Sequence, residues 1–456
     1  MAEDSSSDSD VYPIPSDYEL IDFVGSGDYG TVAKCKNRDT GEPVAIKVSR
    51  FVQTAMREAS ILQELMRQNL DQYNIVKFYD WYQMNNRTGL VLELLDMNLL
   101  DYMKEDRLPL KDIRVIIQQL ATAFNALRSV GVIHGDLKPD NIMLVKDQEQ
   151  SFTVKLIDFG LAFHSSEAVV GSSHQLPYYR APEIMLGLTF TEAIDMWSLG
   201  IVMGFMMLGA LIFPWFCDYN QMKSICEILG QPADHLLDAG LKTEEFFIKT
   251  SDNQWTLISH DQYWKHKISS GNKKFAFSSL DDLKMLSEEL ESEAEAEGWR
   301  QCIELLKEML RVDASERITP SEVLRHPFIT QSYLNEALQP AADELSSSQA
   351  WTNFRTETAT KADDSTQAGQ AQDTQGARNT TLECLSDMLS CATLMLDPDP
   401  AAAPGIAQDT VEIQTELEDT TSDDSEPHEA RKKKKTKKNC IRRFFSWMKR
   451  TFNCPQ

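Results

Sequence analysis

The stretch IHGDLKPDNI, residues 133–142, decides the fold that this sequence predicts. Asp136 and Asn141 stand five positions apart, so one short loop can present a carboxylate base and an amide metal ligand together. Lys138 lies between them, and its ammonium group can neutralise charge on a phosphoryl group. The spacing matches the H-R-D-x-x-x-x-N signature, except that Gly135 stands at the arginine position. The stretch therefore predicts a catalytic loop with Asp136 as its base.

Two more motifs follow on the C-terminal side of this loop. Residues 156–160 read Leu-Ile-Asp-Phe-Gly, and the Asp of such a D-F-G motif binds the magnesium ion that bridges nucleotide phosphates. Residues 181–183 read Ala-Pro-Glu, which closes an activation segment. The sequence therefore assigns Asn141 and Asp158 as the ligands of Mg²⁺.

A glycine-rich stretch lies on the N-terminal side. Residues 24–32 read VGSGDYGTV, a G-x-G-x-x-G-x-V pattern with Gly25, Gly27 and Gly30. Glycine lets a backbone approach phosphates closely and adopt positive φ. A Rossmann dinucleotide loop shares this spacing but should open directly into a helix. Here the strand-like run VAIK at 44–47 follows instead, which argues against a Rossmann loop.

Lys47 at the end of that run can reach the α and β phosphates of a nucleotide. A helical segment at residues 56–62 follows it and offers Glu58 as the carboxylate that holds the lysine in place. Glu64 is the only close rival for this role. We therefore predict an ion pair between Lys47 and Glu58.

The order and spacing of these five motifs leave chance coincidence negligible. Residues 18–329 resemble a eukaryotic protein kinase and, within that superfamily, the homeodomain-interacting protein kinases, which are relatives of the dual-specificity tyrosine-regulated kinases. The resemblance is carried by the runs IHGDLKPDNIMLV, PYYRAPEIMLGLTFTEAIDMWSLG and ILGQPADHLLDAGLKTEEFF.

The resemblance implies an α+β, two-lobed protein kinase fold, with a small β-rich N-lobe at about residues 18–93 and a larger helical C-lobe from about residue 97. It implies phosphorylation of protein substrates on Ser and Thr with ATP and Mg²⁺. Leu92 would lie at the back of the adenine pocket, residues 93–95 would form the hinge, and Glu183 would pair with Arg317. The predicted catalytic residues are Asp136, Lys138, Lys47 and Glu58, and the predicted nucleotide-binding residues are Gly25, Gly27, Gly30, Val32, Ala45, Lys47, Leu92, Glu93 and Leu95.

The activation loop departs from the resembling family. An arginine before the catalytic aspartate receives a phosphorylated loop residue, and Gly135 cannot do so. The homeodomain-interacting kinases also have a small residue there, but they usually keep a loop Tyr and an Arg. In this chain Ser173 occupies the Tyr position and Pro177 the Arg position. We therefore expect a loop that folds without phosphotyrosine, and regulation through Ser172 or Ser173 is the alternative.

Two other loop positions bear on substrate use. Leu176 stands where Ser/Thr kinases usually present a hydroxyl to the catalytic Asp and Lys, which predicts slower catalysis. Arg180 matches the family, and the resemblance suggests a preference for proline just after the phosphorylated residue.

Two rival functions are weighed against an active kinase. A catalytically weak pseudokinase or scaffold would typically have lost at least one catalytic residue, whereas the full set is present here. The altered activation loop keeps this alternative open. A nucleotide-binding oxidoreductase is a distant third, because D-F-G and Ala-Pro-Glu motifs have no role in one.

Composition divides the 456 residues into four parts. We expect a disordered, acidic and Ser-rich N-terminus at 1–16, a kinase domain at 18–329, a disordered acidic linker at 338–430 and a polybasic amphipathic tail at 431–456. The net charge of -25 argues against direct nucleic-acid binding. The eight cysteines form no C-x-x-C pair and no apolar signal segment leads the chain, so we expect an intracellular protein with reduced thiols.

One uncharged run could be mistaken for a membrane span. Residues 196–216 read MWSLGIVMGFMMLGALIFPWF, which is long enough to cross a bilayer. Asp195, Gly209 and Pro214 stand where a buried helix would start and break, and no basic flank fixes an orientation. We therefore predict a helix buried inside a large domain.

The tail at 431–456 carries eleven basic residues and no acidic one. On a helix, Ile441, Phe444, Phe445, Met448 and Phe452 would share one side and the basic residues the other. Such a helix suits an anionic membrane surface, and Cys440 and Cys454 could be palmitoylated. A nuclear import receptor for KKKKTKK and calmodulin are the alternative partners. The predicted location is the nucleus, the cytoplasm or a membrane surface reached through this tail.

Overall fold

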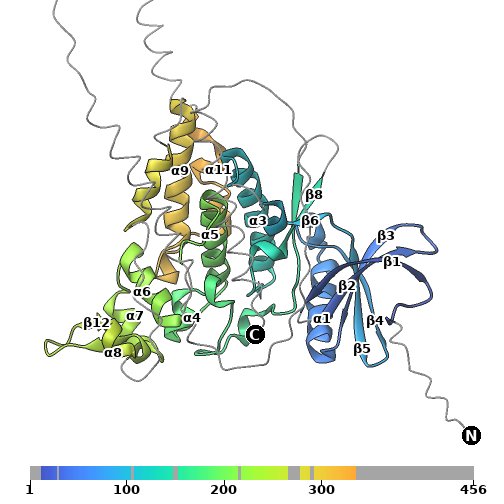
Figure 1. Cartoon of the computed structure of the whole chain (residues 1–456), viewed down its shortest axis with the longest axis horizontal. Coiled ribbons are helices and arrows are strands. Elements are labelled where there is room, and N and C mark those ends of the chain that lie inside the picture. Colours follow the sequence, from blue (N-terminus) through green and yellow to red (C-terminus); the bar gives the residue numbers. More distant parts are fainter. Residues whose placement is uncertain are drawn as a thin grey trace, which may run out of the picture. The chain divides into compact units, whose positions relative to one another are not determined.

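The computed structural model describes residues 12–27, 30–103, 107–146, 152–213, 217–264, 278–287 and 292–334. Residues 1–11 of the predicted disordered N-terminus, the linker at 338–430 and the tail at 431–456 lie outside these ranges. For residues 12–16 the prediction of disorder is wrong, because Tyr12 packs on the N-lobe sheet and its hydroxyl donates to the carbonyl of Thr31 at 2.6 Å. A β-sheet with one long helix precedes a larger helical region in the chain (Figure 1). The predicted two-lobed α+β fold is therefore confirmed.

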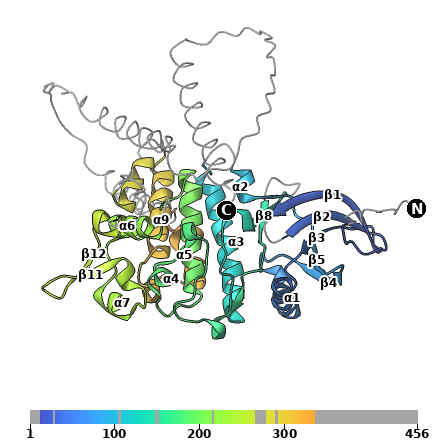
Figure 2. The ribbon, with the colours of Figure 1, turned by 60° about the horizontal axis from the view of Figure 1, so that its bottom comes forward.

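The N-lobe is built on one antiparallel sheet. Its strands are β1 (Tyr18–Gly27), β2 (Gly30–Asn37), β3 (Pro43–Ser49), β4 (Phe78–Met84) and β5 (Arg87–Glu93), in the spatial order β1-β2-β3-β5-β4. The turn between β4 and β5 consists of Asn85 and Asn86, whose φ angles are 50° and 55°. Asparagine tolerates this left-handed conformation, which a type I′ hairpin turn requires at both of its central positions. Helix α1 (Val52–Arg67) packs against β4 and β5 (Figure 2).

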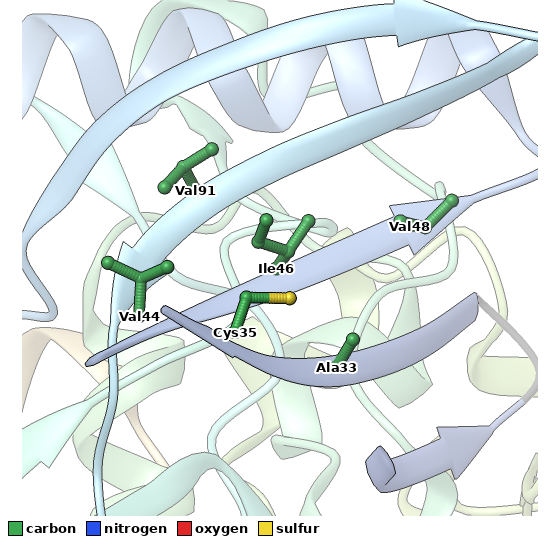
Figure 3. Close-up of a cluster of buried hydrophobic side chains, with 6 residues drawn as sticks. All are labelled: Ala33, Cys35, Val44, Ile46, Val48 and Val91. Carbon is green, nitrogen blue, oxygen red and sulfur yellow. The ribbon is translucent and has the colours of Figure 1, made fainter. Parts of the chain in front are cut away.

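Side chains alternate along the strands of the N-lobe sheet, so one face packs into the core and the other bears Lys47. Ala33 and Cys35 of β2, Val44, Ile46 and Val48 of β3, and Val91 of β5 form a buried apolar cluster (Figure 3). Successive side chains of a strand point to opposite faces of the sheet. Ala45 and Lys47 therefore project away from this cluster. Burial raises the pKa of the Cys35 thiol to about 11, so this cysteine is an unreactive part of the core.

The C-lobe consists mainly of helices, and α3 (Leu110–Ser129), α5 (Ala193–Leu208) and α9 (Glu293–Met309) run side by side in both views (Figures 1 and 2). The other helices are α2 (Leu99–Tyr102), α4 (Pro182–Leu186), α6 (Asp218–Leu229), α7 (Asp234–Ala239), α8 (His260–Trp264), α10 (Pro320–Val323) and α11 (Pro327–Thr330). Short 3-10 turns are η1 (Leu70–Gln72), η2 (Pro139–Asn141), η3 (Ser165–Glu167), η4 (Pro177–Tyr179), η5 (Thr243–Glu245), η6 (Leu280–Ser287) and η7 (Ala314–Glu316).

Three small sheets complete this lobe. One joins β6 (Met97–Asn98), β8 (Ile142–Lys146) and β9 (Phe152–Leu156), one pairs β7 (Val132–Ile133) with β10 (Phe163–His164), and one pairs β11 (Phe247–Lys249) with β12 (Trp255–Leu257). The predicted catalytic loop runs from the end of β7 through η2 into β8. Short strands therefore hold both ends of that loop.

Helix α5 is buried on nearly all sides, as the uncharged run at 196–216 predicted. It ends at Gly209, whose φ of 69° is the left-handed conformation of a helix C-cap. Gly200 faces α9 so closely that a Cβ atom there would lie 3.0 Å from Cβ of Met309. The prediction of a buried helix is confirmed, and Pro214 lies outside the described residues. None of the helices described combines the length and the apolar character that a membrane span needs.

A buried ion pair ties α4 to the chain after η7. The two terminal guanidinium nitrogens of Arg317, NH1 and NH2, donate to Glu183, with N···O distances of 2.6 and 2.9 Å. The Arg317 guanidinium also lies 5.3 Å from the ring centre of Trp197 in α5. The pair that the resemblance implied is therefore present, and it braces the end of the activation segment against the helical core.

Candidate active site

A buried aspartate fixes the backbone of the predicted catalytic loop. Asp195, in the first turn of α5, accepts hydrogen bonds from the backbone N–H of His134 at 2.8 Å and of Gly135 at 2.9 Å. Burial raises the pKa of this carboxyl group, while the two N–H donors and His134 act in the opposite direction. The two bonds attach the loop to the most deeply buried helix of the C-lobe.

Asp136 lies within a small network of polar side chains. Its Oδ2 atom accepts a hydrogen bond from Asn141 Nδ2 at 3.0 Å and lies 3.1 Å from Lys138 Nζ. Asn141 Nδ2 also donates to the backbone carbonyl of Asp136 at 2.8 Å. Because these contacts hold Oδ2, we assign Oδ1 as the oxygen that would accept a substrate proton. The structure thus brings together the three polar residues that the sequence selected in this loop.

A three-residue ion cluster connects the N-lobe to the D-F-G motif. Lys47 Nζ lies 2.9 Å from each carboxylate oxygen of Glu58 and 2.7 Å from Asp158 Oδ1. Burial alone would lower the pKa of Lys47, but the two carboxylates outweigh it and the pKa is raised. The same attraction overcomes burial at Asp158, whose pKa is lowered, whereas burial raises the pKa of Glu58. Lys47 is therefore a cation, and Asp158 is ionised.

Glu64, the rival for the role of Glu58, points elsewhere. Its Oε2 atom lies 3.1 Å from Nε2 of His164 in β10. One pocket is lined by four of the predicted residues and by their neighbours, namely Lys47, Ser49, Thr54, Ala55, Glu58, Asp136, Asp158, Gly160 and Leu161. The structure therefore places the lysine, its acidic partner, the proposed base and the D-F-G aspartate around one space.

His134 couples the catalytic loop to the D-F-G motif. The backbone N–H of Asp136 donates to His134 Nδ1 at 3.3 Å, so Nδ1 is the unprotonated nitrogen. Nε2 then carries the proton and donates to the carbonyl of Ile157 at 3.0 Å. The fully buried imidazole also meets the ring of Phe159 edge-on at 5.0 Å. These contacts hold Asp136 and Asp158 at a fixed separation.

Of the three glycines in the glycine-rich hairpin, only Gly30 is required by a steric constraint that the structure shows. Gly30 opens β2 with a φ of 152°, and a Cβ atom there would lie 2.2 Å from the carbonyl oxygen of Val48. Any other residue would force β2 away from β3. Gly25 has no such neighbour, since its nearest contact would be Val32 Cβ at 3.9 Å. Gly27 ends β1 opposite Gly30. Gly25 therefore leaves open space on the hairpin rather than relieving a clash.

The strand register gathers the predicted nucleotide residues on one face. Val32 is the cross-strand partner of Lys47, and Ala45 is that of Leu92. Directly opposed residues of antiparallel strands lie on the same face of the sheet. Val32, Ala45 and Leu92 therefore share the face of Lys47, opposite the apolar cluster of Figure 3. This face presents apolar side chains beside the lysine, as an adenine-binding surface needs.

Two predicted hinge residues follow Leu92. Glu93 ends β5, and its side chain accepts hydrogen bonds from the backbone N–H of Lys77 at 2.6 Å and from Lys155 Nζ at 2.5 Å. Leu95 lies half-buried between β5 and β6. These bonds occupy the Glu93 carboxylate, so the backbone of this segment is the part that could contact the adenine base of a nucleotide.

The residues assigned to magnesium are chemically suited to it. Magnesium prefers hard oxygen ligands such as carboxylates. Asn141 uses its amide N–H groups on Asp136, which leaves its oxygen as the possible ligand. Lys47 contacts Oδ1 of the ionised Asp158 at 2.7 Å, and the same carboxylate also has Oδ2 as a hard oxygen donor. The donor set of a carboxylate and an amide oxygen therefore fits the ion.

The activation segment is held by hydrogen bonds of the Gln175 side chain and of its backbone carbonyl. This residue is buried and has a φ of 62°. Its side chain donates to the carbonyl of Ile194 and to Ser198 Oγ, both at 2.8 Å, and accepts from the N–H of Ala181 at 3.0 Å. Arg180 NH2 donates to the carbonyl of Gln175 at 3.1 Å. Ser173 is exposed, and Pro177 begins η4.

Sequence reasoning missed three residues that shape this site. Asp195 was considered only as a helix start, although a lone carboxylate leading an apolar helix is a signal of a buried, hydrogen-bonded group. His134 was not given a role, and Gln175 was not noticed. No sequence signal identifies Gln175, because its importance comes from backbone geometry and from partners on α5.

Comparisons with known proteins agree with this geometry. The protein kinase domain family matches residues 18–329. Homeodomain-interacting protein kinase 2 of Mesocricetus auratus is 44% identical over 337 residues, covering 70% of this chain and 29% of that protein. Homeodomain-interacting protein kinase 1 of Mus musculus is 45% identical over 334 residues, with 70% and 28% covered, and kinase 4 of Homo sapiens is 37% identical over 347 residues, with 70% and 56% covered. The chain thus spans less than a third of the length of the first two.

Proposed function

Because the chain belongs to the protein kinase family, we propose that it is a serine/threonine kinase that transfers the γ-phosphoryl group of ATP to protein hydroxyls. The observation that carries this proposal is the contact of Lys47 with both Glu58 and Asp158, at 2.7 to 2.9 Å. That cluster joins the nucleotide-binding face of the N-lobe to the D-F-G motif in the arrangement that transfer requires. The names of the similar proteins support kinase activity, and the choice of Ser and Thr rests on the resemblance.

In the proposed reaction, the substrate hydroxyl oxygen forms a bond to the γ-phosphorus while the bond to ADP breaks. Asp136 takes the hydroxyl proton, and Asn141 orients its carboxylate. Lys138 offsets charge on the transferring group, and Lys47 positions the α and β phosphates. Asp158 and Asn141 would hold a magnesium ion, whose chemistry when bound is to neutralise negative charge on the phosphates.

The geometry around Gln175 supports a preference for proline after the phosphorylated residue. Its carbonyl accepts a hydrogen bond from Arg180 and is therefore occupied. The substrate residue that follows the phosphorylated one would therefore find no free acceptor here for its backbone N–H. An unpaired buried donor costs about 1–3 kcal/mol, whereas proline has no N–H to leave unpaired.

This proposal is tested with the full chain, Mg²⁺-ATP and matched peptides. We expect transfer to Ser and Thr peptides, with kcat/KM at least roughly fivefold higher for Ser-Pro than for Ser-Ala, which corresponds to the lower end of the unpaired-donor cost. Phosphate incorporation and nucleotide binding are measured in parallel. Nucleotide binding without any transfer would favour the scaffold alternative, and equal rates on the two peptides would refute the proline preference.

The proposed kinase does not depend on phosphotyrosine in its activation loop. Gly135, Ser173 and Pro177 together lack both the acceptor and its cationic partners. We expect phosphatase-treated protein to keep most of its peptide kinase activity. Intact-mass spectrometry verifies that phosphate has been removed. The proposal is wrong if treatment silences the enzyme and the lost phosphate maps to Ser172 or Ser173.

The proposed location includes an anionic membrane surface reached through the tail at 431–456, which lies outside the described residues. The support is its charge and pattern, since each Lys or Arg near an anionic surface adds about 1 kcal/mol. A fluorescent fusion of this segment should reach membranes and lose them when Phe444 and Phe445 are changed to Ala. Fluorescence confined to the nucleus and unchanged by both substitutions would instead favour the import receptor.

A further inference from the structure

An aromatic cluster of Phe163, His174 and Phe190 joins the two ends of the activation segment. The rings of Phe163 and His174 are stacked, with centroids 4.5 Å apart and planes inclined by 28°. Phe190 meets Phe163 edge-on at 6.2 Å and lies 5.1 Å from His174. Phe163 lies in β10 just after the D-F-G motif, and His174 precedes Gln175. The cluster therefore bridges the start of the segment and its substrate-facing end.

Gly135 provides the space for this arrangement. Its φ is 72°, and a Cβ atom there would lie 3.3 Å from Phe163 Cε1 and 3.3 Å from the carbonyl oxygen of Leu161. A residue with a side chain would need this strained backbone and would press against the aromatic ring. Gly135 therefore leaves room for the Phe163 ring at the position where other kinases carry an arginine side chain.

The orientation of His174 is fixed by hydrogen bonds. The Ser172 hydroxyl donates to the carbonyl of Val169 at 2.6 Å, so its oxygen accepts from His174 Nε2, 2.8 Å away. Burial lowers the pKa of His174, which favours the neutral ring at neutral pH. The His174 carbonyl accepts from Arg180 Nε at 3.1 Å. The position of the ring is thus linked directly to Gln175, the next residue.

Arg180 is not available to receive a loop phosphate without rearrangement. Its Nε and NH2 atoms donate to the carbonyls of His174 and Gln175, and NH1 lies 3.6 Å from Asp218 Oδ1. The segment is consequently held by stacking and main-chain bonds in the state that the structure describes. Charge pairing with a phosphate would require these contacts to be broken.

We propose that the stack of Phe163 on His174, seated against Gly135, replaces the phosphate–arginine contact that fixes the activation segment in other kinases. Phe163 and His174 are positioning residues that act through Gln175 and do not touch the reacting groups. The proposal rests on the proposed kinase function for its kinetic consequence, whereas its structural consequence can be measured independently of any activity.

The structural consequence is tested by amide hydrogen exchange on the phosphatase-treated full chain. His174→Ala should speed exchange in peptides covering residues 161–180, and His174→Phe should leave it near the wild-type rate, because phenylalanine restores the stack without the bond to Ser172. Tyr263→Ala is the matched control, since it removes a stacked pair with Tyr219 of similar geometry, at 4.3 Å and 18°, away from this segment. That control should leave exchange at 161–180 unchanged.

The kinetic consequence is measured on the same proteins with a Ser-Pro peptide. We expect His174→Ala to lower kcat/KM for the peptide by roughly tenfold, near the upper end of what an aromatic pair contributes. The KM for ATP should stay within about twofold, because the Lys47 cluster is untouched. His174→Phe should recover most of the loss. A purely structural weakening would affect both substrates.

Several outcomes would overturn the proposal. His174→Ala with wild-type exchange and kinetics would show that the stack holds nothing. Equal loosening in His174→Ala and His174→Phe would assign the role to the bond with Ser172. If His174→Ala does not fold, Phe163→Leu supplies the same test, and unaltered exchange at 161–180 in that variant would refute the role of stacking. If the wild-type protein shows no transfer but exchange at 161–180 still speeds up in His174→Ala, only the proposed kinase function is refuted.

Discussion

Asp136→Asn is expected to abolish most phosphoryl transfer while ATP still binds. The amide keeps the shape of the carboxylate but cannot accept the hydroxyl proton, and removing a general base typically costs at least ~10²-fold in rate. The two contacts to Oδ2, from Asn141 and Lys138, show how the present carboxylate is oriented. Asparagine could place its N–H₂ group toward either partner and lose that orientation. Turnover and nucleotide affinity, measured on the same preparation, provide the check.

Nucleotide binding is the internal control for this variant. The Lys47 cluster and the face of β2, β3 and β5 do not involve the Asp136 carboxylate, so the Kd for ATP should change little. Thermal melting within a few degrees of wild type verifies folding. Turnover close to wild type would mean that another group is the base. Loss of both turnover and ATP binding would instead indicate a disrupted loop.

The residues of the site could be predicted because local motifs carry them. The loop at 133–142 holds Asp136, Lys138 and Asn141 within six consecutive residues, so short-range spacing is informative about their proximity. Glu58 was selected because a lysine on a strand needs a carboxylate on the following helix. The contact with Lys47 at 2.9 Å fits that physical requirement. The buried helix at 193–208 was predictable for the same reason, since its uniform apolar character has few explanations.

The remaining features depend on contacts that are distant in sequence. Asp195 reaches His134 and Gly135 across about sixty residues, and no local pattern specifies that meeting. The stack of Phe163 on His174 is a further example, because each residue alone reads as an ordinary loop residue. The positive φ of Gln175 is imposed by its buried partners rather than by its own preference. These features therefore required the three-dimensional arrangement.

Lys47→Met is expected to lower kcat/KM by about 10²–10³-fold, as for loss of one preorganised electrostatic donor. Methionine keeps the length of the side chain and removes its charge. The buried carboxyl group of Glu58 and the partly buried carboxylate of Asp158 would then be left without the cation between them. Their repulsion would displace α1 or the D-F-G motif and would misplace the nucleotide phosphates. Steady-state kinetics with ATP and peptide varied separately measure the loss.

Glu58→Gln separates the positioning of Lys47 from its charge. Glutamine can still accept a hydrogen bond from Nζ but lacks the ionic attraction, so we expect a smaller loss, roughly tenfold, similar to one charged hydrogen bond. Glu64→Gln is the matched control on the same helix. Its carboxylate lies 3.1 Å from His164 and does not approach Lys47, so its kinetics should stay within about twofold of wild type. If Glu64→Gln proved damaging while Glu58→Gln did not, the assigned role of α1 in holding the lysine would be wrong.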